Sequence, residues 1–223
     1  MLQRGGNMSI VVLLGGLVTG YFLSIVIKKI SNIVSGKEDT EIYINMNQLK
    51  KLKKSTTFTA RTIIVILITG LLFIISFLQI GLNVIFIKAL VLNSILIVVS
   101  FIDIEHQIIP NKIIIFTLVI GVLFSFIDNI SFMSGVVGMV LGGGVILILA
   151  LVPGVLGGGD IKLMFVLGIF LGAKGVLYAL LLAFVIASII SIFLLASKIK
   201  KRKDYIPFGP FLAIGSFIAF HFF

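Results

Sequence analysis

The chain has 223 residues, of which 60% are hydrophobic and only 12% are charged, and it contains no cysteine. A soluble domain carries about a quarter charged residues, so this composition excludes an ordinary water-soluble fold. The absence of cysteine excludes disulfides and thiolate metal sites. The net charge of +10 requires no nucleic-acid partner, because membrane proteins concentrate Lys and Arg in their cytoplasmic loops.

Apolar runs long enough to cross a bilayer recur along the chain and predict an all-α polytopic membrane protein. The first span is expected at Met8–Ile30. The polar segment Ser31–Thr59 follows as a short basic cytoplasmic loop. Within it, Met46, Leu49 and Leu52 fall at helical spacing, which is compatible with a helix on the membrane surface or with a solvated loop.

Three longer apolar runs must each fold back, because a helix rises about 1.5 Å per residue and the hydrocarbon core is about 30 Å thick. The polar breaks Gln79–Asn83, Asp128-Asn129 and Gly172–Gly175 are the expected turns. The three runs and a final span are expected at Thr62–Ile102, Lys112–Leu151, Leu163–Ser197 and Ile206–Phe223. The prediction is one membrane domain, 1–223, with about eight transmembrane helices and both termini outside.

The distribution of positive charge supports this topology. When Ser31–Thr59 is placed in the cytoplasm, 15 of the 18 Lys and Arg residues fall inside, and only Arg4, Lys88 and Lys174 fall outside. Such asymmetry is typical of membrane proteins in their native orientation. It places Asp103, at the end of the third span, and Asp160, at the start of the sixth, at the cytoplasmic face.

These two aspartates predict an active site. A carboxylate near hydrocarbon is costly unless it has a function, and two carboxylates lying close together share one proton. The ionised carboxylate can take a proton from a water molecule while the protonated one donates to a substrate carbonyl. Asp103 and Asp160 are therefore predicted to be a catalytic pair that cleaves peptides without a metal or a cofactor.

The residues around Asp160 fit this role. Gly157, Gly158 and Gly159 remove side chains beside the carboxylate, so an extended substrate can approach closely. Lys162 either tunes the pair electrostatically or extends toward water from the membrane boundary. A single aspartate at such a boundary, taken alone, is more often a helix cap or a surface group than a catalyst.

The residues after Asp103 are expected to form a short connection. Pro110 and Asn111 are predicted to end the loop and to start the next span, because proline suits the first turn of a helix. Glu105 and His106 are expected in the polar cytoplasmic loop that precedes them.

Several of these stretches resemble the type IV prepilin peptidases, a family of multi-pass aspartic proteases. The family has an aspartate followed seven residues later by proline, and a GxGD motif with a lysine two residues further on. It also has a PFGP segment that opens the last span, a glycine-led pattern in its first span and a further pattern in its second. The matching stretches are Asp103 with Pro110-Asn111, Gly157-Gly158-Gly159-Asp160-Ile161-Lys162, Ile206-Pro207-Phe208-Gly209-Pro210-Phe211, Gly20-Tyr21-Phe22-Leu23 and Thr69-Gly70-Leu71-Leu72-Phe73.

The resemblance implies that Asp103 and Asp160 are the catalytic pair and that the substrates are prepilins or pseudopilins. Such substrates carry a short basic leader, a glycine before the cut and a hydrophobic helix beyond it, and the leader would be removed at the cytoplasmic face of the cell membrane. The family's second activity is methylation of the new N-terminus with S-adenosylmethionine. Two departures weigh against methylation: the chain lacks the cysteines of the family's zinc-binding CxxC pairs, and it has Ile66 where many members have glutamate.

Two other classes remain open at this point. A presenilin-like intramembrane protease also uses a GxGD aspartate, although Pro207-Phe208-Gly209-Pro210 and the small first loop favour the prepilin group. The alternative from a different class is a small proton- or ion-coupled transporter with Asp103 and Asp160 as its ion site. A close pair of carboxylates indicates a protease, whereas carboxylates separated along a pathway indicate transport.

Overall fold

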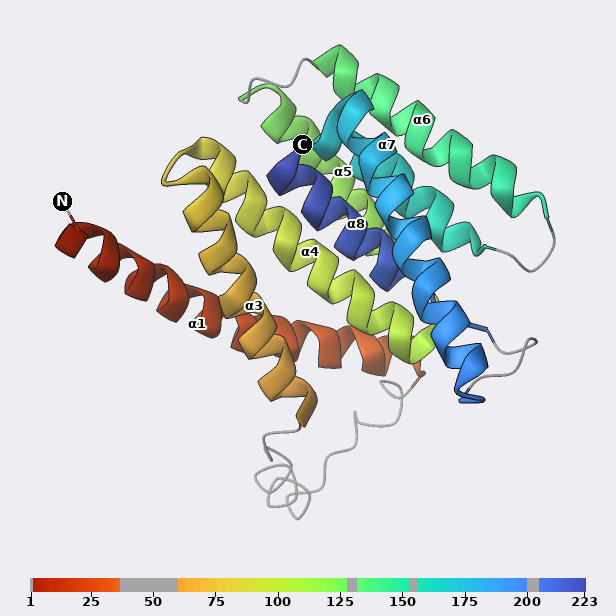
Figure 1. Cartoon of the computed structure of the whole chain (residues 1–223), viewed down its shortest axis with the longest axis horizontal. Coiled ribbons are helices and arrows are strands. Elements are labelled where there is room, and N and C mark those ends of the chain that lie inside the picture. Colours follow the sequence, from red (N-terminus) through yellow and green to blue (C-terminus); the bar gives the residue numbers. More distant parts are fainter. Residues whose placement is uncertain (1, 37–59, 128–131, 153–155, 200–204) are drawn as a thin grey trace. The chain divides into compact units, whose positions relative to one another are not determined.

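The computed structural model describes residues 2–36, 60–127, 132–152, 156–199 and 205–223, and these ranges contain helices and no strand. The chain divides into two compact units, Met1–Gly81 and Leu82–Phe223. The helices are α1 (Leu2–Val34) and α3 (Ala60–Ile80) in the first unit and α4 (Val84–His106), α5 (Asn111–Ser125), α6 (Phe132–Ala150), α7 (Gly158–Ala196) and α8 (Gly209–Phe222) in the second (Figure 1). The predicted all-α class is confirmed, and the single membrane domain stays a prediction.

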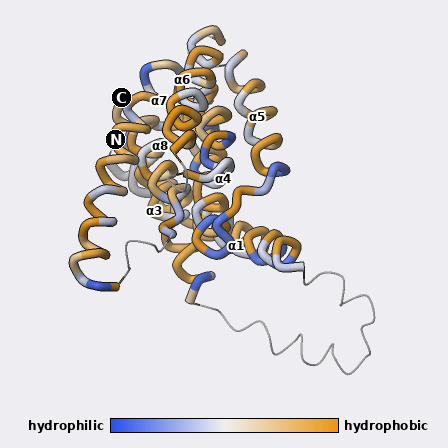
Figure 2. Tube along the Cα trace, turned by 90° about the vertical axis from the view of Figure 1, so that its right-hand side faces the viewer, coloured by the Kyte–Doolittle hydropathy of each residue, from blue (hydrophilic) through white to orange (hydrophobic). Residues whose placement is uncertain are grey.

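The helices are apolar along most of their length (Figure 2). In the described ranges, five are long and apolar enough to cross a membrane, namely α1, α3, α4, α6 and α7, while α5 and α8 are shorter apolar helices. The break between α3 and α4 falls at the expected turn, where Gly81 has a φ of 73°. The expected turn Asp128-Asn129 and the expected surface helix around Met46 lie outside the described residues.

In the first unit, α1 and α3 approach each other closely through glycines. A Cβ added to Gly16 would lie 2.9 Å from the Cα of Gly70, and one added to Gly20 would lie 2.7 Å from the Cα of Ile66. Small residues at such crossings let helix backbones pack within a membrane, where no hydrophobic driving force brings helices together.

The second unit is built around α7, which packs against α5, α6 and α8, and α8 in turn packs against α4. Its core contains fully buried side chains from four of these helices, including Leu92 on α4, Ile146 on α6, Leu167 and Phe170 on α7, and Leu212 on α8. This unit contains both predicted catalytic aspartates.

Helix α7 folds back on itself at Gly172, which has the non-helical angles φ 70° and ψ 178°. A Cβ added to Gly142 of α6 would lie 2.6 Å from the carbonyl oxygen of Met164 and 2.8 Å from a methyl carbon of Val176. In a straight helix these two residues would be about 18 Å apart, so residues 158–171 and 173–196 must run as a hairpin (Figure 1). The turn predicted at Gly172–Gly175 is confirmed.

Lys88, which the predicted topology counts on the outer side, is a buried charged residue. It lies in the first part of α4 and is fully buried. Its Nζ is 5.7 Å from the ring centroid of Phe170 and 5.6 Å from that of Phe220. Aromatic faces attract a cation, and this attraction contributes to holding the side chain inside the second unit.

Candidate active site

Asp103 occupies the last turn of α4. The helix ends because Gln107 adopts the left-handed conformation, with φ 56° and ψ 31°, and donates its backbone N–H to the carbonyl oxygen of Asp103 at 2.8 Å. The Asp103 side chain is 3% exposed. Its Oδ2 accepts a hydrogen bond of 2.9 Å from the backbone N–H of Gly209, the first residue of α8. The end of α4 and the start of α8 therefore position this carboxylate together.

Asp160 occupies the first turn of α7 and is 2% exposed. Gly157 precedes the helix in an extended conformation, and its backbone N–H donates to Oδ2 of Asp160 at 3.1 Å. This is the carboxylate half of a capping box, in which the third helical residue reaches back to the residue before the helix. The glycine-rich stretch thus orients the carboxylate and leaves the space beside it open.

Two contacts join the loop after Asp103 to the start of α7. A Cβ added to Gly159 would lie 3.2 Å from the Cβ of Ile109, so the two backbones meet with little room for a side chain at position 159. The Lys162 ammonium donates a hydrogen bond of 3.0 Å to Oδ1 of Asn111, at the start of α5. These contacts explain why residues about fifty positions apart form one site.

Both carboxylates open onto one pocket with a volume of about 330 Å³. Its described lining combines the two aspartates with the three glycines before Asp160, the extended segment after α4, one lysine and one tyrosine. These residues are Asp103, Gln107, Ile108, Ile109, Gly157, Gly158, Gly159, Asp160, Lys162 and Tyr205. The predicted pair therefore lies in one cavity at the ends of helices.

The ends of two helices offset part of the cost of burying a negative charge in this pocket. Asp160 lies at the N-terminus of α7, and Asp103 accepts from the first backbone N–H of α8. Each carboxylate thus meets the positive end of a helix dipole, which stabilises an anion. At the edge of the pocket, burial raises the pKa of Tyr205 above its ordinary value, and the nearby Asp160 and Asp103 charges raise it further.

The structure brings most of the predicted supporting residues to this site. Lys162 lines the pocket, and Asn111 holds Lys162 without lining it. Pro110 directly precedes α5, as expected.

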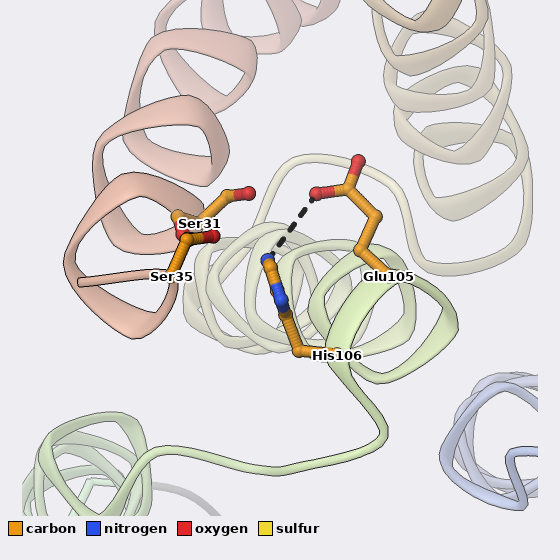
Figure 3. A network of polar contacts seen from close by, with 4 residues as sticks. All are labelled: Ser31, Ser35, Glu105 and His106. Carbon is orange, nitrogen blue, oxygen red and sulfur yellow. Dashed lines mark hydrogen bonds and ion pairs between the residues drawn. The ribbon is translucent and has the colours of Figure 1, made fainter. Parts of the chain in front are cut away.

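The expectation that Glu105 and His106 belong to a loop is wrong, because both lie in the last turn of α4. Figure 3 shows their contact, with 3.8 Å between His106 Nε2 and Glu105 Oε2. The helix includes both residues because its left-handed terminating residue is Gln107. Neither lines the pocket in the part of the chain that is described.

Several residues of the site were not identified as functional from the sequence. Gly209 is predicted only as part of the PFGP motif. No local sequence pattern predicts the hydrogen bond from its backbone N–H to Asp103. Tyr205 directly precedes that motif, and this neighbourhood is the one signal that could have pointed to it. Ile108 and Ile109 look like ordinary apolar residues in the sequence, although both line the pocket.

The part of the chain that contains Asp103 and Asp160 matches a known protein family. The model of the type IV leader peptidase family matches residues 90–192, which include both aspartates. Residues 90–192 belong to the type IV leader peptidase family. The resemblance that the motifs indicated is thereby confirmed.

Curated relatives of this leader peptidase region have names that describe two activities. A prepilin leader peptidase/N-methyltransferase of Bacillus subtilis is 32% identical over 157 residues, covering 69% of this chain and 63% of the relative. A protein of the same name from Xanthomonas campestris is 29% identical over 162 residues, covering 69% of this chain and 56% of the relative. Another from Pseudomonas aeruginosa is 31% identical over 125 residues, covering 52% of this chain and 43% of the relative. The chain thus spans less than two thirds of their length. No solved structure gives a significant match.

Proposed function

We propose that this protein is a membrane aspartic endopeptidase that removes the leader from type IV prepilins or pilin-like proteins. Cleavage takes place at the cytoplasmic face of the cell membrane. The substrate's hydrophobic helix stays in the bilayer beside the enzyme, while its basic leader reaches the pocket from the cytoplasm. The positive-inside distribution of Lys and Arg supports this orientation.

One observation carries the proposal: two almost fully buried carboxylates from distant parts of the chain line one pocket. Each accepts a backbone N–H, and the residues beside Asp160 lack side chains. Buried charged groups are rare unless they have a function. The shared pocket supports hydrolysis over the transporter alternative, in which the two carboxylates would lie apart along a pathway.

The reaction uses water and the two carboxyl groups. The ionised carboxylate takes one proton from a water molecule, whose oxygen forms a bond to the carbonyl carbon of the scissile peptide while the protonated carboxyl donates a hydrogen bond to the carbonyl oxygen. The C–N bond then breaks, and the leaving nitrogen takes a proton from a carboxyl group of the pair. The products are a shortened leader with a free carboxylate and a mature protein with a free amine.

Methylation of that amine is a separate question. The curated relatives have N-methyltransferase in their names, and the methyl donor of the family is S-adenosylmethionine. The pocket volume of about 330 Å³ is near the lower limit of small-molecule sites, and the scissile segment of the substrate must occupy it. The described pocket lining shows no separate site for the cofactor, so we derive no step through it.

The proposal is tested by co-expressing the protein with a candidate prepilin and measuring leader removal by mass spectrometry. Asp103→Asn and Asp160→Asn keep the size and polarity of each side chain but remove its acid–base function. We expect each variant to lower the cleavage rate by about 100- to 10,000-fold, the usual contribution of acid–base catalysis. The same spectra show whether the new N-terminus gains the mass of a methyl group.

Glu105→Gln is the matched control, because it removes a carboxylate from the same helix end without altering the described pocket lining. It should cleave at the wild-type rate. Cleavage by both asparagine variants at that rate would show that the aspartates are not the catalytic pair.

A further inference from the structure

Tyr205 is a pocket residue to which the two-carboxylate mechanism assigns no role. It lies directly before the segment that opens α8, and its side chain is 37% exposed. It lines the same pocket as Asp103 and Asp160. Among the described residues of that lining, it alone carries a hydroxyl group.

The Tyr205 hydroxyl and the Asp160 carboxylate both lie near Gly157. A Cβ added to this glycine would lie 3.4 Å from Oδ2 of Asp160 and 3.4 Å from Oη of Tyr205. The two oxygens therefore border the same small space, which stays free of side-chain atoms because residue 157 is glycine. A distance of 3.4 Å is ordinary contact for a carbon atom, so a substrate backbone atom fits between the carboxylate and the phenol.

The phenol is a hydrogen-bond donor under working conditions. Because burial and the neighbouring carboxylates raise the pKa of Tyr205, the hydroxyl keeps its proton at neutral pH. The Lys162 ammonium is already bonded to Asn111. Tyr205 thus offers a neutral O–H at the place where a substrate carbonyl would approach Asp160.

We infer that Tyr205 donates a hydrogen bond to the carbonyl oxygen of the scissile peptide and stabilises the oxyanion that forms on it. This inference rests on the proposed peptidase function. When the water oxygen bonds to the carbonyl carbon, the C=O electron pair moves to the oxygen, and the ionised carboxylate takes the proton of the water. Tyr205 keeps its own proton throughout, and its bond to the oxygen shortens as charge develops. Donors aimed at a developing oxyanion lower the barrier more than they strengthen substrate binding.

Tyr205→Phe tests this role, because it removes the hydroxyl and keeps the ring. We expect kcat for leader removal to fall by about 10- to 100-fold and KM to change by less than about threefold, as for an interaction made chiefly in the transition state. Tyr178→Phe is the matched control. Tyr178 stacks on Phe223 at 4.3 Å and lies outside the described pocket lining, so this variant should cleave like the wild type.

A second variant separates the proposed role from a merely structural one. Replacing Tyr205 with a difluorotyrosine keeps the shape of the side chain but makes its hydroxyl more acidic. Because the phenolate cannot donate a hydrogen bond, kcat should decline at lower pH than in the wild type. This variant also decides the question if Tyr205→Phe does not fold.

The outcomes distinguish this inference from the proposed function. Wild-type kcat in Tyr205→Phe, or an unchanged pH profile with difluorotyrosine, would overturn the role of Tyr205. If Asp160→Asn is inactive in the same assay, the peptidase proposal stands without it. If the wild-type protein itself leaves prepilins intact, the peptidase proposal fails, and this inference fails with it.

Discussion

At the scale of single residues, the site depends on glycines that let backbone reach the carboxylates. Gly209 donates its N–H to Asp103, and a Cβ at this position would lie 2.7 Å from Oδ2 and 3.1 Å from Cγ of that side chain. Carbon cannot approach a carboxylate oxygen so closely, so any larger residue must displace Asp103 or the start of α8. The PFGP segment therefore has a physical role in holding one member of the proposed pair.

Gly209→Ala should reduce leader removal by about tenfold or more, because displacements of about 1 Å at a reacting group can lower rates by about 100-fold. The protein should still fold, since the change adds one methyl group at a helix end, and Asp103, the side chain that it meets, borders the pocket and can move toward it. The assay is the initial rate of prepilin cleavage in detergent or vesicles.

Gly144→Ala is the control for this substitution. A Cβ on Gly144 would meet no atom within 4 Å, so this variant should retain wild-type activity. If Gly209→Ala cleaves as fast as Gly144→Ala, the close contact with Asp103 does not determine activity.

At the scale of helices, the position of Asp160 depends on the packing of α6 against the hairpin of α7. A Cβ added to Gly168 would lie 2.2 Å from the carbonyl carbon of Gly138 and 2.3 Å from its oxygen. These are backbone atoms that cannot rotate away, so the two helices can keep this distance only while both positions are glycine. Such close crossings substitute for the hydrophobic effect that is absent between helices in lipid.

Gly168→Ala should therefore destabilise the second unit, by at least the 1–3 kcal/mol that is roughly typical of overpacking in a tight core. The expected result is a lower midpoint of thermal unfolding in detergent, measured by circular dichroism. Gly144→Ala, on the same α6 helix as Gly138, should unfold near the wild-type temperature. Equal midpoints for the two variants would contradict the close contact between α6 and α7.

At the scale of the whole molecule, the chain is organised by its membrane topology. The predicted orientation places Lys174, just after the turn in α7, on the outside and Lys198, just after α7, on the inside. Both side chains are exposed, and the chain has no cysteine. Single cysteines can therefore be introduced without a background of native thiols.

Lys174→Cys should react with a membrane-impermeant maleimide in intact cells, whereas Lys198→Cys should react only after the cells are opened. The reason is the positive-inside rule, which predicts that the basic segment Lys198–Asp204 lies in the cytoplasm. The reverse labelling pattern would invert the topology and move the proposed active site to the outer face.

Local patterns in the sequence were sufficient to predict the helical class, most helix boundaries and the position of the two aspartates at helix ends. Apolar runs and turn residues are local signals, and the membrane enforces them because every backbone polar group in lipid must be bonded within its own helix. The break at Gly172 was also predictable, because the apolar run around it is too long for one membrane span.

The way in which the pocket is assembled could not be predicted from these local patterns. The bond from Gly209 to Asp103 joins residues 106 positions apart. The contact between Ile109 and Gly159 joins a loop to the start of α7, about fifty positions further along the chain. The place of Tyr205 beside Asp160 depends on how α8 packs against α4 and α7. No local pattern encodes such contacts, because they depend on how helices pack together rather than on the periodicity within one helix.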